Sequence, residues 1–181
     1  MRIIGGKYRG KKLFSPASDN VRPTSDRARE ALFNILNSNL ENPLSDYTLL
    51  DVFSGTGAVA LEALSRGAKQ VCLVDIEPKN LRKNTALFPL EQNRIKVIQA
   101  DVAHLPTSGE KYDLLFMDAP YQKGLSEVAL RELDKKGWLN RHTLCMIEVE
   151  KNEQLDVPSC YQVQSERIYG LAKIIFMLYQ P

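Results

Sequence analysis

Short apolar runs separated by segments of helix length dominate the middle of the chain. Five runs have this character, at residues 47–53, 71–75, 95–100, 112–117 and 143–149. Nearly all of their positions are apolar, rather than alternately apolar and polar, which is typical of parallel strands covered on both faces. The pattern therefore predicts an α/β fold with a doubly wound, mostly parallel sheet.

The segments between these runs carry helix signals. A helix is predicted to start after Thr24 or Ser25, either of which can cap it, and to end near Asn39. Its apolar face is predicted to consist of Ala28, Ala31, Leu32, Ile35 and Leu36. Three further helices are predicted after the first strand up to about Arg66, from Pro78 onward, and over residues 124–136.

The N-terminal segment departs from this alternation. Residues 1–14 contain the turn signals Gly5-Gly6 and Gly10, so we expect a short hairpin or an extended arm there. Prolines among small polar residues predict a loop over residues 15–23. The sheet is therefore expected to begin only after this N-terminal extension and its helix.

The C-terminal segment departs from the alternation as well. Residues 161–169 and 172–179 are strand-like, and the Gly170-Leu171 junction between them leaves no room for a helix. This spacing predicts an antiparallel hairpin. We therefore divide the chain into a basic N-terminal hairpin and helix over residues 1–40 and a sheet domain over residues 41–181.

Composition excludes several classes of protein. The length of 181 residues corresponds to about one domain. No apolar run reaches the roughly 20 residues of a membrane span, and the N-terminus lacks the apolar core of a signal peptide. Cys72 and Cys145 lie in apolar runs without a Cys-x-x-Cys pair, so we expect buried thiols in a reducing cytoplasm. His104 and His142 are too scattered for a zinc site, and no metal is predicted.

The formal net charge of +2 conceals an asymmetry. Residues 1–30 carry eight basic and three acidic groups, a net +5, so the remaining residues must carry −3. A basic arm on a slightly acidic body favours a polyanionic partner, whereas the commoner meaning of such a run is a solvated charged face. The basic residues that we expect to contact a nucleic acid are Arg2, Lys7, Arg9, Lys11, Lys12, Arg22 and Arg27.

Acidic residues recur where the predicted strands end. Asp51, Asp75, Asp101 and Asp118 each lie at or just beyond the C-terminal end of an apolar run. In an open α/β sheet, ligands bind at that edge. One aspartate there is a common strand terminator or helix cap, but four in successive units predict a pocket with excess negative charge.

A glycine-rich loop follows the first predicted strand. Gly55 and Gly57 allow a tight turn and a close approach of a ligand to the backbone. The Gly-x-Gly-x-x-Ala pattern also fits a dinucleotide fingerprint, but an anionic pyrophosphate suits an acid-lined pocket poorly. The cationic groups of S-adenosylmethionine suit it better. We therefore predict this cofactor, held at its loop by Asp51, Ser54, Gly55 and Gly57.

The next two strand ends supply candidates for the rest of the cofactor. Asp75 follows Asp51 by 24 residues, the region in which an acid meets a ribose. Asp101 is placed to accept a hydrogen bond from the adenine amino group. Ile76 is a candidate to pack on the adenine face, and Val102 is a candidate beside Asp101. Plain core packing is the alternative for both of these apolar residues.

The fourth strand end reads Asp118-Ala119-Pro120-Tyr121. An exocyclic amine on a base is a poor nucleophile because its lone pair is delocalised into the ring. The Asp118 carboxylate and the Ala119 carbonyl can accept its two hydrogens and hold the nitrogen toward a methyl group. Pro120 would stiffen the turn, and Tyr121 could stack on a base swung out of its helix. The alternative for the tetrapeptide alone is a turn with a buried tyrosine.

With these residues in view, the chain resembles the RsmD family of bacterial small-subunit rRNA guanine-N2 methyltransferases. The resemblance covers nearly the whole chain, and its segment from Arg22 to Asn34 is much more specific to this family than the glycine loop. The matching segments are residues 1–10, 22–34, 50–58, 61–68, 137–139 and 169–170.

The resemblance implies a Rossmann-like methyltransferase domain that transfers a methyl group from S-adenosylmethionine to the N2 amine of one guanine in 16S rRNA. It implies cofactor contacts for Gly55, Gly57 and Asp75, and catalytic roles for Asp118, Pro120 and Tyr121. The chain departs from the family at position 119, where alanine replaces proline but keeps the carbonyl acceptor, and at position 75, where the family commonly has glutamate.

Several alternatives stay open. The tetrapeptide suits other exocyclic amines, so a methyltransferase acting on adenine or on another nucleic acid is one, and a non-catalytic RNA-binding or ribosome-assembly protein is another. A dehydrogenase is a third. Arg27 and Arg29 either meet phosphates or pair with Asp26 and Glu30 on a helix surface. We expect a cytoplasmic monomer whose partner is 16S rRNA, free or within the small ribosomal subunit or its precursor.

Overall fold

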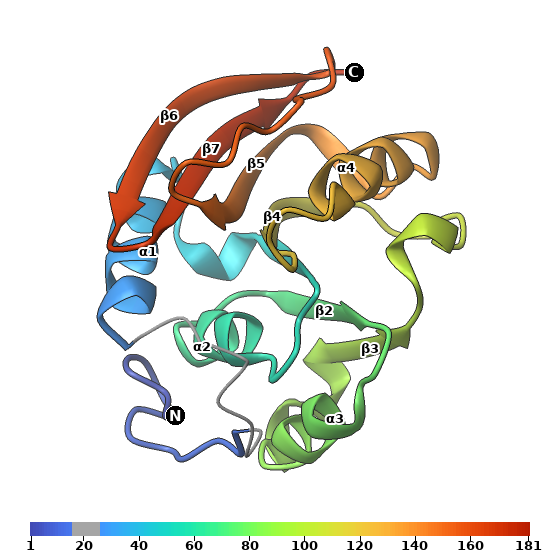
Figure 1. Ribbon diagram of the computed structural model, residues 1–181. Coiled ribbons are helices and arrows are strands. Elements are labelled where there is room, and N and C mark those ends of the chain that lie inside the picture. Colours follow the sequence, from blue (N-terminus) through green and yellow to red (C-terminus); the bar gives the residue numbers. More distant parts are fainter. Residues whose placement is uncertain (16–25) are drawn as a thin grey trace.

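A seven-stranded sheet forms the centre of the computed structural model, which describes residues 1–15 and 26–181 (Figure 1). The strand order is β3-β2-β1-β4-β5-β7-β6. The strands are β1 (Thr48–Val52), β2 (Gln70–Asp75), β3 (Ile95–Gln99), β4 (Tyr112–Asp118), β5 (Leu139–Glu150), β6 (Tyr161–Tyr169) and β7 (Ala172–Tyr179).

Parallel pairing links the first five strands, from β3 at one edge through β2, β1 and β4 to β5. β7 then pairs antiparallel with β5, and β6 pairs antiparallel with β7 as the other edge strand. Figure 1 shows β6 and β7 as the long curved hairpin coloured red. The predicted doubly wound sheet and its C-terminal antiparallel hairpin are therefore confirmed.

Four α-helices lie in the described residues, each where a helix was predicted. They are α1 (Asp26–Asn39), α2 (Ala58–Ser65), α3 (Lys79–Thr85) and α4 (Leu125–Lys135). Three short 3-10 helices add to them: η1 (Leu44–Asp46), η2 (Pro89–Arg94) and η3 (Val102–His104). Pro78 stands at the N-cap position of α3, where its fixed φ suits the entry into a helix. The caps expected at Thr24 and Ser25, and the loop predicted over residues 15–23, fall almost entirely outside the described residues.

The fifth strand begins earlier than the apolar run predicts. β5 starts at Leu139 rather than at residue 143, because Leu139 pairs with Tyr112 before the register shifts. The polar residues 140–142 interrupt the apolar pattern of the strand, and His142 has a positive φ of 68°. Thr143 bridges the irregularity, since its hydroxyl donates to the Tyr112 carbonyl oxygen at 2.7 Å.

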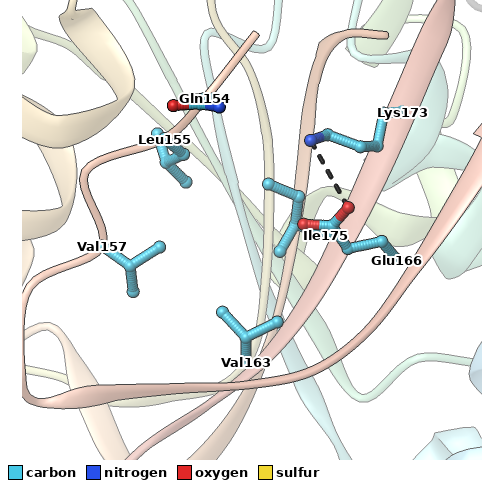
Figure 2. Close-up of a pocket in the computed structure, with 7 residues that line it drawn as sticks. All are labelled: Gln154, Leu155, Val157, Val163, Glu166, Lys173 and Ile175. Carbon is cyan, nitrogen blue, oxygen red and sulfur yellow. Dashed lines mark ion pairs between the residues drawn. The ribbon is translucent and has the colours of Figure 1, made fainter. Parts of the chain in front are cut away.

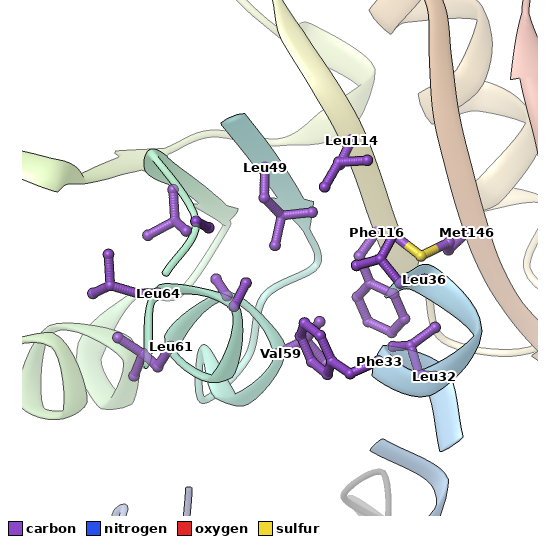
Figure 3. Packing of buried hydrophobic residues seen from close by; sticks show 14 of the residues in the cluster. Leu32, Phe33, Leu36, Leu49, Val59, Leu61, Leu64, Leu114, Phe116 and Met146 are labelled. Carbon is purple, nitrogen blue, oxygen red and sulfur yellow. The ribbon is translucent and has the colours of Figure 1, made fainter. Parts of the chain in front are cut away.

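Alternation along the strands divides the core between the two faces of the sheet. On one face, Leu49, Phe116 and Met146 pack against α1 and α2, as Figure 3 shows. On the other face, Leu50 and Ile147 belong to a second buried cluster that includes residues of α4. We call these the α2 face and the α4 face. Burial on both faces explains why the strands are apolar at nearly every position.

The N-terminal segment folds into the predicted hairpin and docks on α2. Arg2 and Lys12 form an antiparallel bridge, and Ile3 is buried in the core of the α2 face. The Gly5-Gly6 pair lies directly against the end of α2, where a Cβ on Gly6 would stand 1.9 Å from the Ser65 carbonyl oxygen. These glycines therefore permit a close helix contact as well as a turn.

A buried glutamate on α2 fastens this hairpin. The Glu62 carboxylate is fully buried and accepts the backbone N–H groups of Ile4 and Gly5, each at 2.7 Å. Arg66 donates to the same carboxylate at 2.8 Å, and the buried Arg29 of α1 lies 3.8 Å from it. Because a buried carboxylate needs such partners, this network joins the hairpin, α1 and α2. No helix within the described residues is long and apolar enough to cross a membrane.

Candidate active site

The acidic residues of three adjacent strands point to the same face of the sheet. Asp51, Asp75 and Asp118 each follow, at a spacing of two, a residue that is buried on the α2 face. Side chains two residues apart on a strand share a face, so the three carboxylates meet at the C-terminal ends of β1, β2 and β4. Three of the four acids predicted at the C-terminal ends of the strands therefore lie on one face of the sheet, and we call this region the acid-lined edge.

The glycine loop follows β1 and leads into α2, and the Ser54 N–H donates to the Val74 carbonyl oxygen of β2 at 3.1 Å. The Ser54 hydroxyl donates to the Asp51 carbonyl oxygen at 2.6 Å, and the Gly57 N–H donates to the Ser54 carbonyl oxygen at 2.7 Å. Gly55 and Gly57 have φ angles of 55° and 75°, which favour glycine. A Cβ on Gly57 would stand 2.6 Å from Leu81, whereas one on Gly55 would meet only a carbonyl oxygen at 4.0 Å. Gly57 therefore serves packing, and Gly55 faces open space.

Asp75 is held rigidly by backbone donors. Its two carboxylate oxygens accept the N–H groups of Gly55 and Glu77, at 2.7 and 2.8 Å. Each oxygen keeps a further lone pair that can accept from a ligand hydroxyl. Ile76 beside it is 61% exposed and Val102 is 5% exposed. Burial places Val102 in the core of the α4 face, while Ile76 is available for contact with a ligand.

Asp101 follows β3 and begins η3. Its carboxylate accepts the Ala103 N–H at 3.0 Å and lies 3.6 Å from the His104 ring nitrogen Nδ1. The side chain of Asp101 is about half exposed, so one oxygen can still accept from a ligand amine. The structure thus gives Asp101 a capping role and leaves its predicted contact with adenine as a prediction.

Burial makes this edge strongly unfavourable for negative charge. Burial raises the pKa of Asp51 to about 8, a shift that the Ala60 N–H opposes and the Asp75 charge reinforces. Burial also raises the pKa of Asp118 to about 8, with further contributions from the charges of Glu148 and Asp51. Within the described residues, no basic side chain contributes to either shift. A cation bound here would favour ionisation of both groups.

The tetrapeptide turns sharply after β4. Ala119 is 4% exposed, so its small side chain fits into the protein while its carbonyl remains as an acceptor. Pro120 is exposed, and Tyr121 is 39% exposed. The Tyr121 hydroxyl donates to the Glu148 carboxylate at 3.2 Å. Burial and this neighbouring carboxylate raise the pKa of the Tyr121 phenol, which therefore stays protonated as a hydrogen-bond donor.

Glu148 is a site residue that the sequence analysis did not identify. It stands opposite Asp118 in the parallel pairing of β4 and β5, and it is 7% exposed. Its sequence signal is a single acid inside an otherwise apolar run. The run 143–149 predicts a buried strand, and a carboxylate buried within a strand needs a partner. This requirement could have singled it out.

The predicted basic residues fall into two groups. Three of them contact the protein itself: Arg2 pairs with Asp26 at 3.1 Å, Lys7 pairs with Glu91 at 2.8 Å, and Lys11 donates to the Leu87 carbonyl oxygen at 2.7 Å. The hydrogen bonds from Lys7 and Tyr8 hold the pKa of Glu91 low, at about 2. The side chains of Arg9, Lys12 and Arg27 are exposed, and Arg22 lies outside the described residues.

Arg29 pairs with Asp26, which is one of the two arrangements expected for it, but it does so from a buried position rather than on a helix surface. It is fully buried, and its guanidinium donates to the Arg2 carbonyl oxygen at 2.6 Å and to Asp26 at 3.1 Å. Burial lowers its pKa, which the charges of Glu62 and Asp26 oppose. The side chain thus secures the hairpin from inside and is closed to phosphates. No cluster of three potential metal ligands lies among the described residues.

Two cavities lie apart from the acid-lined edge. One of about 430 Å³ is formed by the loop after β5 and by the C-terminal hairpin, where Lys173 pairs with Glu166 at 3.4 Å (Figure 2). Apolar side chains supply much of the rest of its lining: Leu155, Val157, Val163 and Ile175. The other, of about 600 Å³, lies between the N-terminal hairpin, Glu30 of α1 and Arg66.

Comparisons with known proteins agree with this architecture. A solved structure of the protein yhhF from Escherichia coli has a TM-score of 0.82, with 34% sequence identity over 99% of this chain and 98% of that chain. A SAM-dependent methyltransferase from Aquifex aeolicus has a TM-score of 0.62 at 17% identity, covering 83% of this chain and 89% of its own. The second likeness supports the Rossmann-like methyltransferase fold alone.

Curated relatives extend the likeness to sequence. The ribosomal RNA small subunit methyltransferase D of Escherichia coli is 36% identical over 99% of this chain and 89% of its own length. The protein of the same name from Haemophilus influenzae is 32% identical over 99% and 93%. The family described as conserved hypothetical protein 95 matches residues 1–178. The chain therefore belongs to this family, the RsmD family that its sequence motifs predict.

Proposed function

We propose that this chain transfers a methyl group from S-adenosylmethionine to the exocyclic N2 amine of a guanine in 16S rRNA. The observation that carries the proposal is the position of Asp118. It ends β4 within a cluster of buried acids and begins the tetrapeptide that supplies a carbonyl and an aromatic ring. The relatives of this chain that are named ribosomal RNA small subunit methyltransferase D support RNA of the small ribosomal subunit as the substrate.

The residues at the acidic edge fit the cofactor. S-adenosylmethionine supplies a methyl group on a cationic sulfonium. Gly55 leaves open space at the loop, and the rigid Asp75 carboxylate can accept from ribose hydroxyls. The exposed Ile76 side chain offers an apolar surface to the adenine, and Asp101 offers an acceptor to its amino group. The carboxylates of Asp51 and Asp118 would be stabilised in their charged forms by the cation.

The substrate amine is activated by positioning. The Asp118 carboxylate and the Ala119 carbonyl accept the two N–H hydrogens, so the nitrogen lone pair points toward the methyl group. Tyr121, which is 39% exposed, provides an aromatic ring on which the base can stack. The tetrapeptide requires a base that has left its helix, because the amine of a stacked base cannot reach the strand end.

Exposed basic side chains on the hairpin and on α1 supply the RNA contacts. Arg9, Lys12 and Arg27 extend into solvent and can neutralise phosphates without selecting a sequence. We place the activity in the cytoplasm, where the small ribosomal subunit or its precursor is assembled. Selection of one guanine then comes from the rim of the site or from the shape of the ribosomal particle.

Methyl transfer from labelled S-adenosylmethionine tests this proposal. Small-subunit particles from a strain lacking the gene and protein-free rRNA would be compared as substrates, and the methylated nucleotide mapped. We expect one N2-methylguanine in 16S rRNA, absent with the Asp118→Ala variant. A methylated adenine would favour the broader N-methyltransferase alternative. Tight S-adenosylmethionine binding with no transfer to either substrate would contradict the proposed reaction, and no binding at all would favour a non-catalytic assembly protein.

A further inference from the structure

The end of β5 lies beside the catalytic tetrapeptide. Asp118 of β4 and Glu148 of β5 are direct partners in the parallel pairing, and β7 flanks Glu148 on its other side through Ile174. Glu148 follows Met146 by two residues, and Met146 is buried on the α2 face. The Glu148 side chain therefore points to the same face as Asp118, from the next strand.

Three carboxylates at the end of β5 and just beyond it accept hydrogen bonds from the last residue of the tetrapeptide and from the residue that follows it. The Tyr121 hydroxyl donates to Glu148 at 3.2 Å, and the Gln122 side-chain amide donates to the Glu150 carboxylate. The Gln122 backbone N–H donates to the Glu153 carboxylate at 3.3 Å. Gln122 itself has a φ of 57°, which is uncommon for a residue other than glycine. The backbone N–H and the side chain of Gln122 are both hydrogen-bonded, so these contacts hold the loop in this conformation.

The contact between Tyr121 and Glu148 differs from the other two in its burial. Glu148 is 7% exposed, whereas the residue Tyr121 is 39% exposed. The hydroxyl end of the ring is thus anchored inside the protein while part of the ring stays accessible. An aromatic side chain on an exposed loop otherwise samples several rotamers, and a single anchored orientation lowers the entropy that stacking must remove.

We propose that Glu148 is a positioning residue for methyl transfer: by accepting the Tyr121 hydroxyl, it fixes the ring on which the target base stacks beside Asp118. The inference rests on the proposed function for its substrate. The hydrogen bond itself, between a buried carboxylate and a phenol, is independent of that function. Glu148 acts through Tyr121 and needs no contact with the base or the cofactor.

Four variants distinguish the effect of the hydrogen bond between Tyr121 and Glu148, which we call the anchor, from an effect of side-chain packing. Tyr121→Phe removes only the hydroxyl, Glu148→Ala removes the acceptor, and Glu148→Gln keeps an oxygen acceptor without the charge. The matched control is Glu166→Gln, a strand carboxylate that pairs with Lys173 on the C-terminal hairpin. We expect kcat/KM for the RNA substrate to fall about tenfold in Tyr121→Phe and in Glu148→Ala, the loss of one hydrogen bond to a charged group.

The combined Tyr121→Phe/Glu148→Ala variant should be no slower than either single variant, since each removes the same hydrogen bond. At about pH 9, where Asp118 is ionised with or without the Glu148 charge, Glu148→Gln should stay within about threefold of the wild type, because its amide oxygen still accepts. Glu166→Gln should be unchanged. Losses that multiply in the double variant, or a Glu148→Gln variant as slow as Glu148→Ala, would overturn the proposal. If Glu148→Ala fails to fold, Tyr121→Phe decides alone, and wild-type turnover in it contradicts the anchor.

A second readout does not depend on turnover. Ring-labelled tyrosine gives an NMR signal for Tyr121, assigned from its absence in Tyr121→Phe. We expect this signal to shift and broaden in Glu148→Ala, to stay near its wild-type position in Glu148→Gln, and to be unaffected in Glu166→Gln. An unchanged signal in Glu148→Ala contradicts the proposal. A wild-type protein that transfers no methyl group while showing these shifts would instead contradict the proposed function and leave the anchor established.

Discussion

Asp118 is a much stronger hydrogen-bond acceptor for an amine as a carboxylate than as a neutral acid, and its surroundings oppose ionisation. Burial, with the charges of Glu148 and Asp51, raises its pKa to about 8. The kcat/KM for the cofactor should therefore rise with pH and level off above about 8, since this parameter follows the enzyme before the cofactor binds. The kcat at saturating cofactor should level off at lower pH, because a bound cation favours the carboxylate. Measurements of kcat/KM and kcat between pH 6 and 9 test both expectations. If the two parameters had the same midpoint pH, the pH dependence would not come from Asp118.

Removing this carboxylate should separate catalysis from cofactor binding. Asp118→Ala is expected to lower turnover by at least about a hundredfold, since the amine loses its charged acceptor. Cofactor affinity should change far less, because the glycine loop and Asp75 supply those contacts. Calorimetry with S-adenosylmethionine and single-turnover assays measure the two effects separately. Near-normal turnover in this variant would exclude the role given to Asp118.

Asp51 is expected to lower the stability of the cofactor-free protein as the pH rises, while its carboxylate strengthens cofactor binding. Burial raises its pKa in the folded protein to about 8, so the stability contributed by its protonated form is lost as pH rises from about 4 toward 8. The neutral Asp51→Asn variant should therefore have a higher Tm than the wild type at pH 8 without cofactor, and the gain should shrink toward pH 5. Its affinity for S-adenosylmethionine should fall. Melting curves at the two pH values test this, and an equal difference at both would contradict it.

At the scale of elements, periodicity predicts those parts whose structure follows from burial. The strands ending at Asp51, Asp75 and Asp118 are apolar throughout because helices cover both sheet faces, so their positions and their terminal acids could be read from the sequence. The first part of β5 could not, because polar residues interrupt its apolar pattern. Glu148 was missed for a related reason. Its role depends on its pairing with Asp118, a residue 30 positions earlier in the chain, and local sequence signals do not show this register.

The docking of the N-terminal hairpin depends on a contact between elements that local sequence signals do not encode. Gly5 and Gly6 read as turn residues, yet a Cβ on Gly6 would stand 1.9 Å from the Ser65 carbonyl oxygen of α2. Arg29 reads as a surface residue of α1, yet it is buried and donates to the Arg2 carbonyl oxygen. Both observations follow from the buried Glu62, whose carboxylate draws donors from the hairpin.

Gly6→Ala should destabilise the protein more than Gly10→Ala. Both residues have positive φ, at 74° and 86°, so each substitution costs about 1–2 kcal/mol of backbone strain. Only Gly6 faces α2; a Cβ on Gly10 would meet nothing within 4 Å. Gly6→Ala should therefore cost at least about 1 kcal/mol more than its control, through a shift of the hairpin. Denaturant unfolding gives both values, and equal losses would show that the hairpin docks loosely.

For the whole molecule, the net charge of +2 combines an acidic sheet edge with a basic N-terminal segment. The structure refines the prediction that this segment contacts RNA, because its basic residues are not equally available. Lys7 pairs with the buried Glu91, and Lys11 donates to the Leu87 carbonyl oxygen. Lys7 is exposed as well but is paired, whereas Arg9 and Lys12 are exposed and have no ion pair among the described residues. The hairpin is also fastened to α2, so the backbone that carries these two side chains has a fixed position relative to the site.

RNA affinity should therefore depend on salt chiefly through Arg9 and Lys12, which do not already contact an acidic group in the part of the chain that the structure describes. Each phosphate contact contributes roughly 0.7 to the slope of log affinity against log salt for a single strand. Replacing both Arg9 and Lys12 with alanine should lower the slope by about 1.4, without loss of thermal stability. The matched Lys7→Ala/Lys11→Ala variant should lower the Tm and change the slope less, because each lysine already contacts the protein. Filter binding at several salt concentrations distinguishes them. If the two variants lowered the slope equally, the internal pairs would have to open on RNA binding, and the hairpin would present four cations rather than two.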